Sequence, residues 1–220
     1  MSNIRIFVSH RIDIDSETVD TPVYFPVRCG AVYDEEGNSE IQGDDTGDNI
    51  SKLRMSFCEF TVQYWAWKNV DADYYGLCHY RRYLSFSDKR YKNTVFNMVR
   101  ELKLTPHEKK KYHLDDTKKI EKTVKQYDMI IPVVAKASEM SYNRAEFKTL
   151  REMWESYNGV YFEQGIIDKM FSLIKEYSPE YYNSACEYFS GKYHRAFNCY
   201  IMKKELFVRM CEFQFPIMKR

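Results

Sequence analysis

The chain has 220 residues, of which 44% are hydrophobic and 30% are charged, a balance typical of a folded globular protein that excludes a disordered one. Its 33 Lys and Arg residues nearly match its 32 Asp and Glu residues, and the formal net charge of +1 argues against a general nucleic-acid-binding protein. No apolar run approaches the roughly 20 residues that a membrane helix needs, and the N-terminus lacks the apolar core of a signal peptide, so we expect a soluble, cytoplasmic protein.

The first part of the chain predicts a strand followed by an acidic loop. Residues 4–8 alternate apolar and polar side chains and predict a strand that ends at the polar residues Ser9 and His10. Residues 34–48 contain seven acidic residues, no basic residue and three glycines, so we expect a loop there.

A helix is expected from about Ser51 to Lys68. Asp48 and Asn49, at the end of the acidic loop, are residue types that cap the N-termini of helices. Apolar residues recur within this helix at spacings of three and four, which predicts one buried face formed by Leu53, Phe57, Phe60, Tyr64 and Trp67.

The next predicted strand leads directly into a cluster of polar residues. Residues 74–78 form a nearly uncharged run typical of a buried strand, and the residues that follow are His79, Tyr80, Arg81 and Arg82. Ligands of open α/β sheets bind outside the carboxyl ends of the strands, and a guanidinium group matches a phosphate in geometry and charge. We therefore favour anion binding over a surface arginine pair that bridges to acidic residues. In an extended segment the two arginines would point to opposite sides, so that only one would face a ligand.

Strands and helices alternate through the rest of the chain. Residues 88–125 carry 12 basic and 6 acidic residues and predict a basic insert, which either rests on anionic lipid or, as we slightly favour, simply faces solvent. We further expect a buried strand at 129–133, helices near 144–157, 163–176 and from 178 onward, a last strand at 197–202 and a last helix at 203–213. This alternation predicts the α/β class with a mixed sheet.

Three further groups of polar residues have more than one interpretation. The carboxylates of residues 44–49 could hold a metal ion, accept hydrogen bonds from ribose hydroxyls or cap the following helix, and chemistry alone favours capping. Asp71 and Asp73 form the Asp-x-Asp pattern that holds manganese in many sugar transferases. They precede a strand, however, where a metal-binding pair should follow one, so we expect a solvated turn. His194 and Asn198 lead into the last strand and either line a cleft or pack in the interior.

Several segments together resemble one known family. The most specific are DDTGDNIS, FCEFTVQYWAWKN and DYYGLCHYRRYL, at residues 44–51, 57–69 and 73–84. With the shorter segments IFVSH, YDMIIP and FNCYIMKKELF, they are similar, in order and over nearly the whole chain, to the bacterial family once filed as domain of unknown function 4422. Its members are glycosyltransferases found with capsule and cell-surface polysaccharide genes. The resemblance implies a GT-A-like fold, in which a Rossmann-type mixed sheet flanked by helices binds a nucleotide sugar, usually a UDP-sugar.

The resemblance also implies roles for individual residues. Those that would contact the nucleotide sugar are His10, Gly30, Ala31, Asp44, Asp45, Thr46, Asp48, Asn49 and Tyr80. The catalytic residues would be His79, Arg81 and Arg82, because they occupy the strand end where many GT-A enzymes keep a metal-binding Asp-x-Asp. Cationic side chains can stabilise a diphosphate leaving group as a metal ion does. We therefore expect transfer without a cofactor, and a divalent cation is the alternative that we do not favour.

The expected function follows from the same resemblance. The chain would move a hexose, with galactose favoured, from a UDP-sugar to a surface-polysaccharide acceptor that is a glycan or a lipid-linked glycan. It would work in the cytoplasm, with peripheral contact to the inner face of the membrane and no nucleic-acid partner. One domain, 1–220, would combine a donor-binding part, roughly 1–135, with a helical acceptor-side part, roughly 136–220, and the acceptor-side residues would be His194 and Asn198.

Two departures from the family pattern support an alternative. Members often carry a His and an Asp just ahead of the helix expected at 163–176, where this chain has Tyr161 and Gly165, so a general base at that position is missing. Members also tend to continue beyond the last helix, whereas this sequence ends shortly after residues 215–218. The alternative is a catalytically silent or split sugar-nucleotide-binding subunit that requires a partner chain or an oligomer.

Overall fold

The computed structural model describes residues 3–35, 40–91, 94–95, 98–101, 103–140, 146–195 and 198–220. The chain forms two compact units. Unit 1 comprises Met1–Pro132 and Phe197–Cys211, and unit 2 comprises Val133–Ala196 and Glu212–Arg220. The division at Pro132 falls near the expected one at residue 135, but the segment that begins at Phe197 belongs with unit 1.

Unit 1 contains a mixed sheet and the helices that cover it. Its strands are β1 (Ile4–Arg11), β2 (Tyr24–Cys29), β3 (Gln42–Gly43), β4 (Tyr74–His79), β5 (Arg82–Leu84), β6 (Thr94–Val95), β7 (Met98–Arg100), β8 (Met129–Ile130) and β11 (Tyr200–Lys203). Its helices are the short 3₁₀ turns η1 (Ala31–Tyr33) and η2 (Ser51–Leu53), then α1 (Arg54–Phe57), α2 (Phe60–Asn69), α3 (Pro106–Lys111), α4 (Thr117–Val124) and the first part of α9 (Lys204–Met218).

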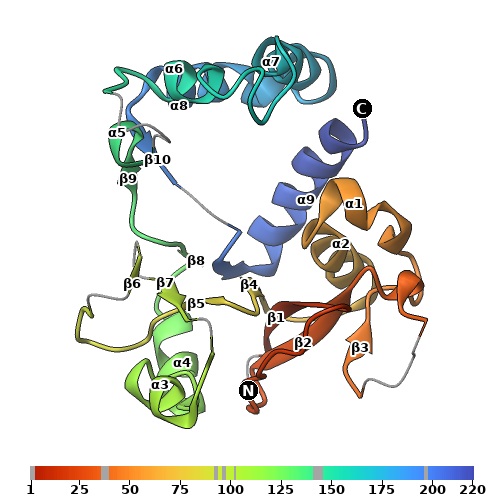
Figure 1. Ribbon diagram of the computed structural model, residues 1–220, viewed down its shortest axis with the longest axis vertical. Helices are drawn as coiled ribbons and strands as arrows, with labels where there is room; N and C mark the ends of the chain where they lie inside the picture. The colour runs from red at the N-terminus through yellow and green to blue at the C-terminus, as the bar shows by residue number, and fades with distance from the viewer. Residues whose placement is uncertain are drawn as a thin grey trace. The chain divides into compact units, whose positions relative to one another are not determined.

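Four parallel strands lie side by side in the order β3-β2-β1-β4 (Figure 1). Beyond β4 the sheet is antiparallel, because β5 pairs with the end of β4 and is followed by β7 and β6, while β11 pairs with both β4 and β8. Gly76 permits the close approach of β11, since a Cβ atom there would lie 3.0 Å from Cγ1 of Ile201. The predicted α/β class with a mixed sheet is confirmed.

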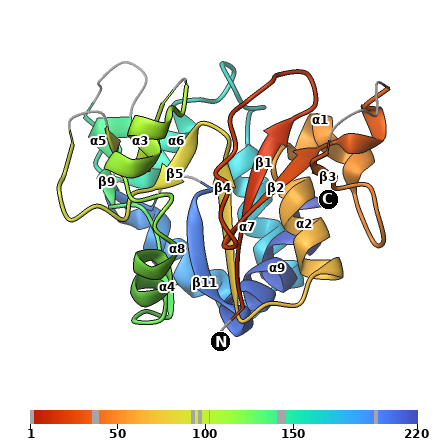
Figure 2. The same cartoon turned by 90° about the horizontal axis from the view of Figure 1, so that it is seen from below.

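Both faces of the sheet in unit 1 are covered. One face carries a core cluster that includes Ile4, Ile6, Val8, Tyr83, Tyr112 and Ile120, so the insert around α4 packs on this side. On the other face the ring of Phe7 meets Trp65 of α2 edge-on, with 6.2 Å between ring centroids. Tyr75 stacks on Phe207 of α9 at 4.3 Å. Figure 2 shows α2 and α9 beside the strands they cover.

The prediction of one continuous helix from Ser51 to Lys68 is wrong. The backbone of Cys58 has φ 46° and separates α1 from α2. The break is stabilised because the Cys58 carbonyl oxygen accepts hydrogen bonds from Cys29 Sγ at 3.1 Å and Thr61 Oγ1 at 3.0 Å. The predicted buried face is also wrong at Leu53, which is 41% exposed.

The structure also corrects the prediction that Asp48 and Asn49 cap the helix after the acidic loop. Ile50 occupies the N-cap position of η2. Asn49 still helps there, because its Oδ1 accepts from the Ser51 N–H at 3.2 Å.

Other predicted elements exist with different bounds. The strand expected to be buried at 129–133 is the two-residue β8, and Met129 is 47% exposed, so that prediction is wrong in length and burial. The acidic loop contains the short strand β3. The last strand is β11; Phe197, where we expected it to begin, lies outside the described residues. The last helix, α9, runs on to Met218.

Unit 2 is mainly helical. Its elements are β9 (Ala135–Lys136), α5 (Ala137–Met140), α6 (Leu150–Glu155), α7 (Ile166–Tyr177), η3 (Pro179–Tyr181), α8 (Tyr182–Ser190), β10 (Tyr193–His194) and the end of α9. Strands β9 and β10 pair antiparallel, and Leu150 and Met153 form a small core with Trp154 and Tyr188. The helix predicted near 144–157 is the shorter α6, and residues 144 and 145 lie outside the described part of the chain.

Candidate functional site

The strand order of unit 1 creates a crevice at one edge of its sheet. The chain passes from β1 to β2 and β3 on one side and then returns through α1 and α2 to β4 on the other side of β1. The carboxyl ends of β1 and β4 are therefore the point at which the strand order reverses. In open α/β folds ligands bind at such a point. His10 lies at the end of β1 and His79 at the end of β4.

Both histidines at this point are neutral at pH 7. His10 is 2% exposed, and burial lowers its pKa to about 4. Its Nδ1 lies 2.7 Å from Ser16 Oγ, and its buried Nε2 has no hydrogen-bond partner among the described residues. Burial, followed by the charges of Arg82 and Arg81, lowers the pKa of His79 to about 4 as well. A buried polar atom without a partner at a strand end is an atom that a bound ligand can satisfy.

Residues 79–82 form a tight hairpin instead of one extended segment. His79 pairs with Arg82, and Tyr80 and Arg81 form the turn between β4 and β5. The premise that the two arginines lie in one extended segment is therefore wrong, because Arg81 is part of the turn and Arg82 begins β5. That only one of them faces a ligand stays a prediction. The exposed Arg81 places its guanidinium carbon 4.9 Å from the centre of the Tyr80 ring. The hairpin is anchored to β1 by the Tyr80 N–H, which donates to the Ser9 carbonyl at 3.0 Å.

Two further arginines, which the sequence patterns did not single out, lie at this edge. Arg11 ends β1, and Arg54 begins α1. Both form ion pairs with Asp13, at 2.9 Å for Arg54, and the hydrogen bond from Arg11 holds the pKa of Asp13 well below its usual range. Two cations of this edge thus share one carboxylate. The signal in the sequence was the position of Arg11 directly after the polar strand end.

Asp44 is a buried hydrogen-bond acceptor close to the end of β3. It is 0% exposed, and its carboxyl oxygens accept hydrogen bonds from the backbone N–H groups of Gly30 and Ala31, each at 2.9 Å. They also accept from Ser51 Oγ at 2.6 Å and from Thr61 Oγ1. Asp44, Gly30 and Ala31 thus bind one another, and the polar groups named here are already occupied. Asp44 is therefore a buried acceptor that joins the turn after β2 to η2 and α2, and its contact with a nucleotide sugar stays a prediction.

Gly30 can only be glycine at this turn. Its φ is 74°, in the left-handed region, and a Cβ atom would lie 2.1 Å from Cδ of Arg54. Arg54 therefore packs directly on the Gly30 backbone, and the turn after β2 positions one of the cations of the edge.

The rest of the acidic loop is tied to α2. Trp65 Nε1 donates to Thr46 Oγ1 at 2.9 Å, and Tyr64 donates its hydroxyl to Asp48 Oδ1 at 3.2 Å. Asn49 donates to the carbonyl oxygens of Asp45 and Gly47, at 2.9 and 3.0 Å. The side chain of Asp45 is exposed and follows β3 at the same edge of the sheet. This loop presents the Asp45 carboxyl group on a fixed backbone.

An open pocket lies beside the reversal point. It encloses about 560 Å³ and is lined by the loop after β1, including Asp15 and Glu17, by Tyr80 and by Lys103. A volume of this size falls within the range of about 300–1,000 Å³ that small-molecule sites occupy. Ser16, which contacts His10, is also part of its wall. Of the sequence-predicted residues at the ends of β1 and β4, Tyr80 lines this cavity, and His10 contacts its wall through Ser16.

Several other predicted residues lie elsewhere. Asp71 and Asp73 precede β4, where Lys204 pairs with Asp71 and the Asn3 N–H donates to Asp73 at 2.7 Å, so they form a turn at the opposite end of the strand. Within the part of the chain that the structure describes, no group of three or more His, Cys, Asp or Glu residues is placed to hold a metal ion. No helix in that part is long and apolar enough to cross a membrane.

The two residues expected on the acceptor side belong to different units. His194 lies in unit 2, where its Nδ1 is 2.8 Å from the Tyr188 hydroxyl and burial lowers its pKa. It lines a largely apolar cavity of about 460 Å³. Asn198 lies in unit 1 and is half-buried. The structure does not bring these two residues together within one unit.

The basic insert uses part of its charge internally. Lys119 pairs with Asp88 at 2.7 Å, and Lys125 pairs with Glu121 at 3.4 Å. The ammonium group of Lys111 lies 4.7 Å from the centre of the Tyr112 ring. Contact of this insert with anionic lipid stays a prediction.

Comparison with known proteins defines the family. Residues 5–220 match the model of the family described as Domain of unknown function (DUF4422), and the chain belongs to this family. It is also similar to a solved structure, the WbbM bifunctional glycosyltransferase in its apo form, with 26% sequence identity and a TM-score of 0.83. The alignment covers 99% of this chain and 36% of that chain, so this chain spans little more than a third of the WbbM length. No curated protein matches.

Proposed function

We propose that this chain is a glycosyltransferase that moves a hexose, with galactose favoured, from a UDP-sugar to a surface-polysaccharide acceptor. The observation that carries the proposal is the cluster at the end of β4, where the charges of Arg81 and Arg82 act on His79 and where Tyr80 lines a pocket of about 560 Å³. The likeness in fold to the WbbM bifunctional glycosyltransferase supports the same proposal.

The chemistry that this edge would perform is stabilisation of a leaving group. In the transfer step the bond between the anomeric carbon and the β-phosphate oxygen breaks, and UDP leaves with the electron pair. The oxygen of the acceptor hydroxyl bonds to that carbon, and the hydroxyl proton passes to the departing diphosphate or to solvent. Negative charge then develops on the diphosphate, and fixed cations stabilise it more strongly as it grows. Arg81 and Arg82 would supply that charge without a divalent cation. His79, neutral at pH 7, would donate one hydrogen bond to the same group.

The acidic loop would hold hydroxyl groups of the donor. Asp45 is exposed at the carboxyl end of β3, and an exposed carboxylate accepts hydrogen bonds from ribose or hexose hydroxyls. Thr46, Asp48 and Asn49 would keep the loop in place through their bonds to α2 and to the loop backbone. The acceptor would be a glycan or a lipid-linked glycan, which the chain would meet in the cytoplasm with peripheral contact to the inner face of the membrane.

A second candidate function is a catalytically silent or split sugar-nucleotide-binding subunit that requires a partner chain. One observation favours it: Tyr161 and Gly165 precede α7, where members of the family often carry a His and an Asp. Such a subunit would bind the donor as described above but would release no UDP until the partner chain is added.

Donor binding can be tested by thermal-shift titration with UDP, UDP-galactose, UDP-glucose and inorganic diphosphate, each in EDTA and in manganese. A ligand at 100 times its Kd stabilises the folded state by about 2.7 kcal/mol, which for a chain of this size raises Tm by roughly 5–10 °C. We expect one UDP-sugar to give the largest shift and EDTA to leave it unchanged. The absence of any shift with uridine nucleotides would contradict both candidate functions.

A further inference from the structure

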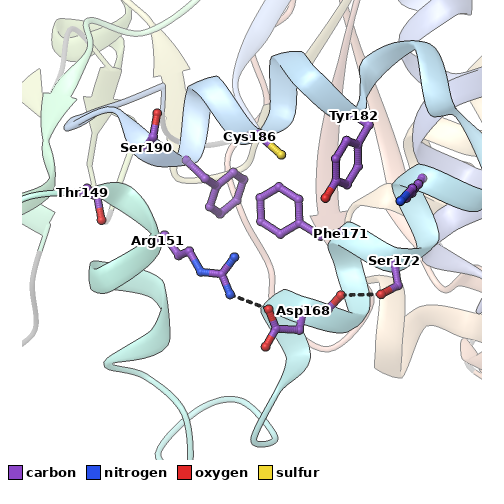
Figure 3. Close-up of a pocket in the computed structure, with 10 residues that line it drawn as sticks. Thr149, Arg151, Asp168, Phe171, Ser172, Tyr182, Cys186 and Ser190 are labelled. Carbon is purple, nitrogen blue, oxygen red and sulfur yellow. Dashed lines mark hydrogen bonds and ion pairs between the residues drawn. The ribbon is translucent and has the colours of Figure 1, made fainter.

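A second pocket lies entirely within unit 2. It encloses about 510 Å³ between α6, α7 and α8 and is remote in sequence from the residues of the donor site (Figure 3). Three aromatic rings contribute to it: Phe171 meets Phe189 at 5.3 Å and Tyr182 at 6.2 Å between ring centroids, both in edge-to-face geometry. The Phe171 side chain is 7% exposed, whereas Tyr182 and Phe189 are half-buried at the wall. One side of the pocket is thus aromatic.

The opposite side of the pocket is polar. Arg151 forms ion pairs with Glu155 at 2.7 Å and with Asp168, and its guanidinium carbon lies 5.5 Å from the centre of the Phe171 ring. The Asp168 side chain remains 72% exposed, and Ser172 donates its hydroxyl to the Asp168 carbonyl at 3.0 Å. Figure 3 shows Arg151 and Asp168 facing each other below the ring of Phe171. The pocket therefore combines fixed donors and acceptors with aromatic surface.

This combination favours one class of ligand. An anion would have to compete with Glu155 and Asp168 for Arg151, and the other cation of the lining, the exposed Lys175, has its ammonium group 5.6 Å from the centre of the Tyr182 ring. A lipid chain would require an apolar lining throughout, but hydroxyl groups of Thr149, Ser172 and Ser190 line this pocket. A pyranose has C–H faces that pack on aromatic rings and hydroxyl groups that bind planar Arg–Asp pairs.

We propose that the pocket formed by Arg151, Asp168, Phe171 and Tyr182 is a carbohydrate-binding site that holds a hexose unit of a glycan. Its volume lies within the usual range of about 300–1,000 Å³ for small-molecule sites. The site deepens the proposed function, and its link to transfer rests on that function, because a transferase with a glycan acceptor needs a surface that retains the glycan. Binding of sugar by the pocket is independent of the donor.

The test is titration of the whole chain with methyl β-galactopyranoside, methyl α-glucopyranoside and lactose, followed by saturation-transfer NMR. We expect saturable millimolar binding of at least one of them. Tyr182→Leu and Arg151→Ala should weaken it by about tenfold each, which corresponds to about 1.4 kcal/mol. Tyr193→Leu is the matched control, since Tyr193 is a 48% exposed tyrosine of unit 2 that does not line the pocket. Its Kd should equal that of the wild type.

A third variant covers the case in which these substitutions disturb folding. Ser172 is exposed on α7, and Ser172→Trp would fill the pocket without removing a packed side chain. The proposal is overturned if none of the three sugars binds, or if Tyr182→Leu and Ser172→Trp bind as the wild type does. Thermal shift by UDP on the same variants separates the two proposals. If a pocket variant loses sugar binding but keeps its UDP response, the result supports the pocket proposal and leaves the donor site unaffected. If the wild type binds sugar but shows no UDP response, the result counts against the donor site alone.

Discussion

Replacing Arg81 by alanine is expected to slow hexose transfer from the UDP-sugar by about 10²–10³-fold, the usual effect of removing one preorganised group that stabilises developing negative charge. The effect should appear mainly in kcat, because the charge on the diphosphate grows on the way to the transition state. Arg81 is exposed in the turn between β4 and β5, and its side chain contacts the Tyr80 ring, so the variant should fold normally. Steady-state release of UDP measures the change.

The control for this variant is Arg90→Ala. Arg90 is an exposed arginine of the same unit, beyond β5, and its loss removes the same formal charge from the chain. Its kcat should stay within about twofold of the wild type, because an exposed charge at a distance is largely screened by salt. An Arg81→Ala variant with the kcat of the wild type would show that Arg81 does not act on the leaving group.

The second large effect is expected in stability. Asp44→Ala should lower the free energy of unfolding by about 3–5 kcal/mol, because four buried donors lose their acceptor together. Two are the backbone N–H groups of Gly30 and Ala31, and two are the hydroxyls of Ser51 and Thr61. Urea unfolding followed by tryptophan fluorescence gives the value directly.

Asp45→Ala is the matched control for this measurement. Asp45 is the next residue in the chain and carries the same charge, but its side chain is exposed. Its loss should change the free energy of unfolding by no more than about 0.5 kcal/mol. If both variants unfold at the same urea concentration, Asp44 does not hold the turn after β2 to η2 and to the start of α2.

The parts of the fold that depend on local sequence patterns could be predicted. The alternation at residues 4–8 and the uncharged run at 74–78 predicted β1 and β4, and the fold class followed from the order of strands and helices. The position of His79 directly after the strand predicted at 74–78 placed it at the carboxyl edge, where it ends β4, since that edge is defined by strand direction alone.

The parts that depend on contacts distant in sequence could not be predicted. The break at Cys58 depends on a hydrogen bond from Cys29, and the burial of Asp44 depends on a turn 14 residues earlier. The sequence pattern therefore predicted a helix cap at residues 44–49, whereas Asp44 in this segment is a buried hydrogen-bond acceptor. Arg54 was missed for the same reason: its neighbours at the edge, Gly30 and Asp13, lie far from it in the chain.

The most direct test of the central claim is the rate of UDP release from UDP-galactose and UDP-glucose by the wild-type chain, measured with a glycan acceptor in EDTA and again with added manganese. If Arg81 and Arg82 stabilise the diphosphate, the rate in EDTA should equal the rate in manganese, because fixed guanidinium groups already supply the charge that a cation would otherwise bring. Turnover that vanishes in EDTA and returns with manganese would contradict this account of the site.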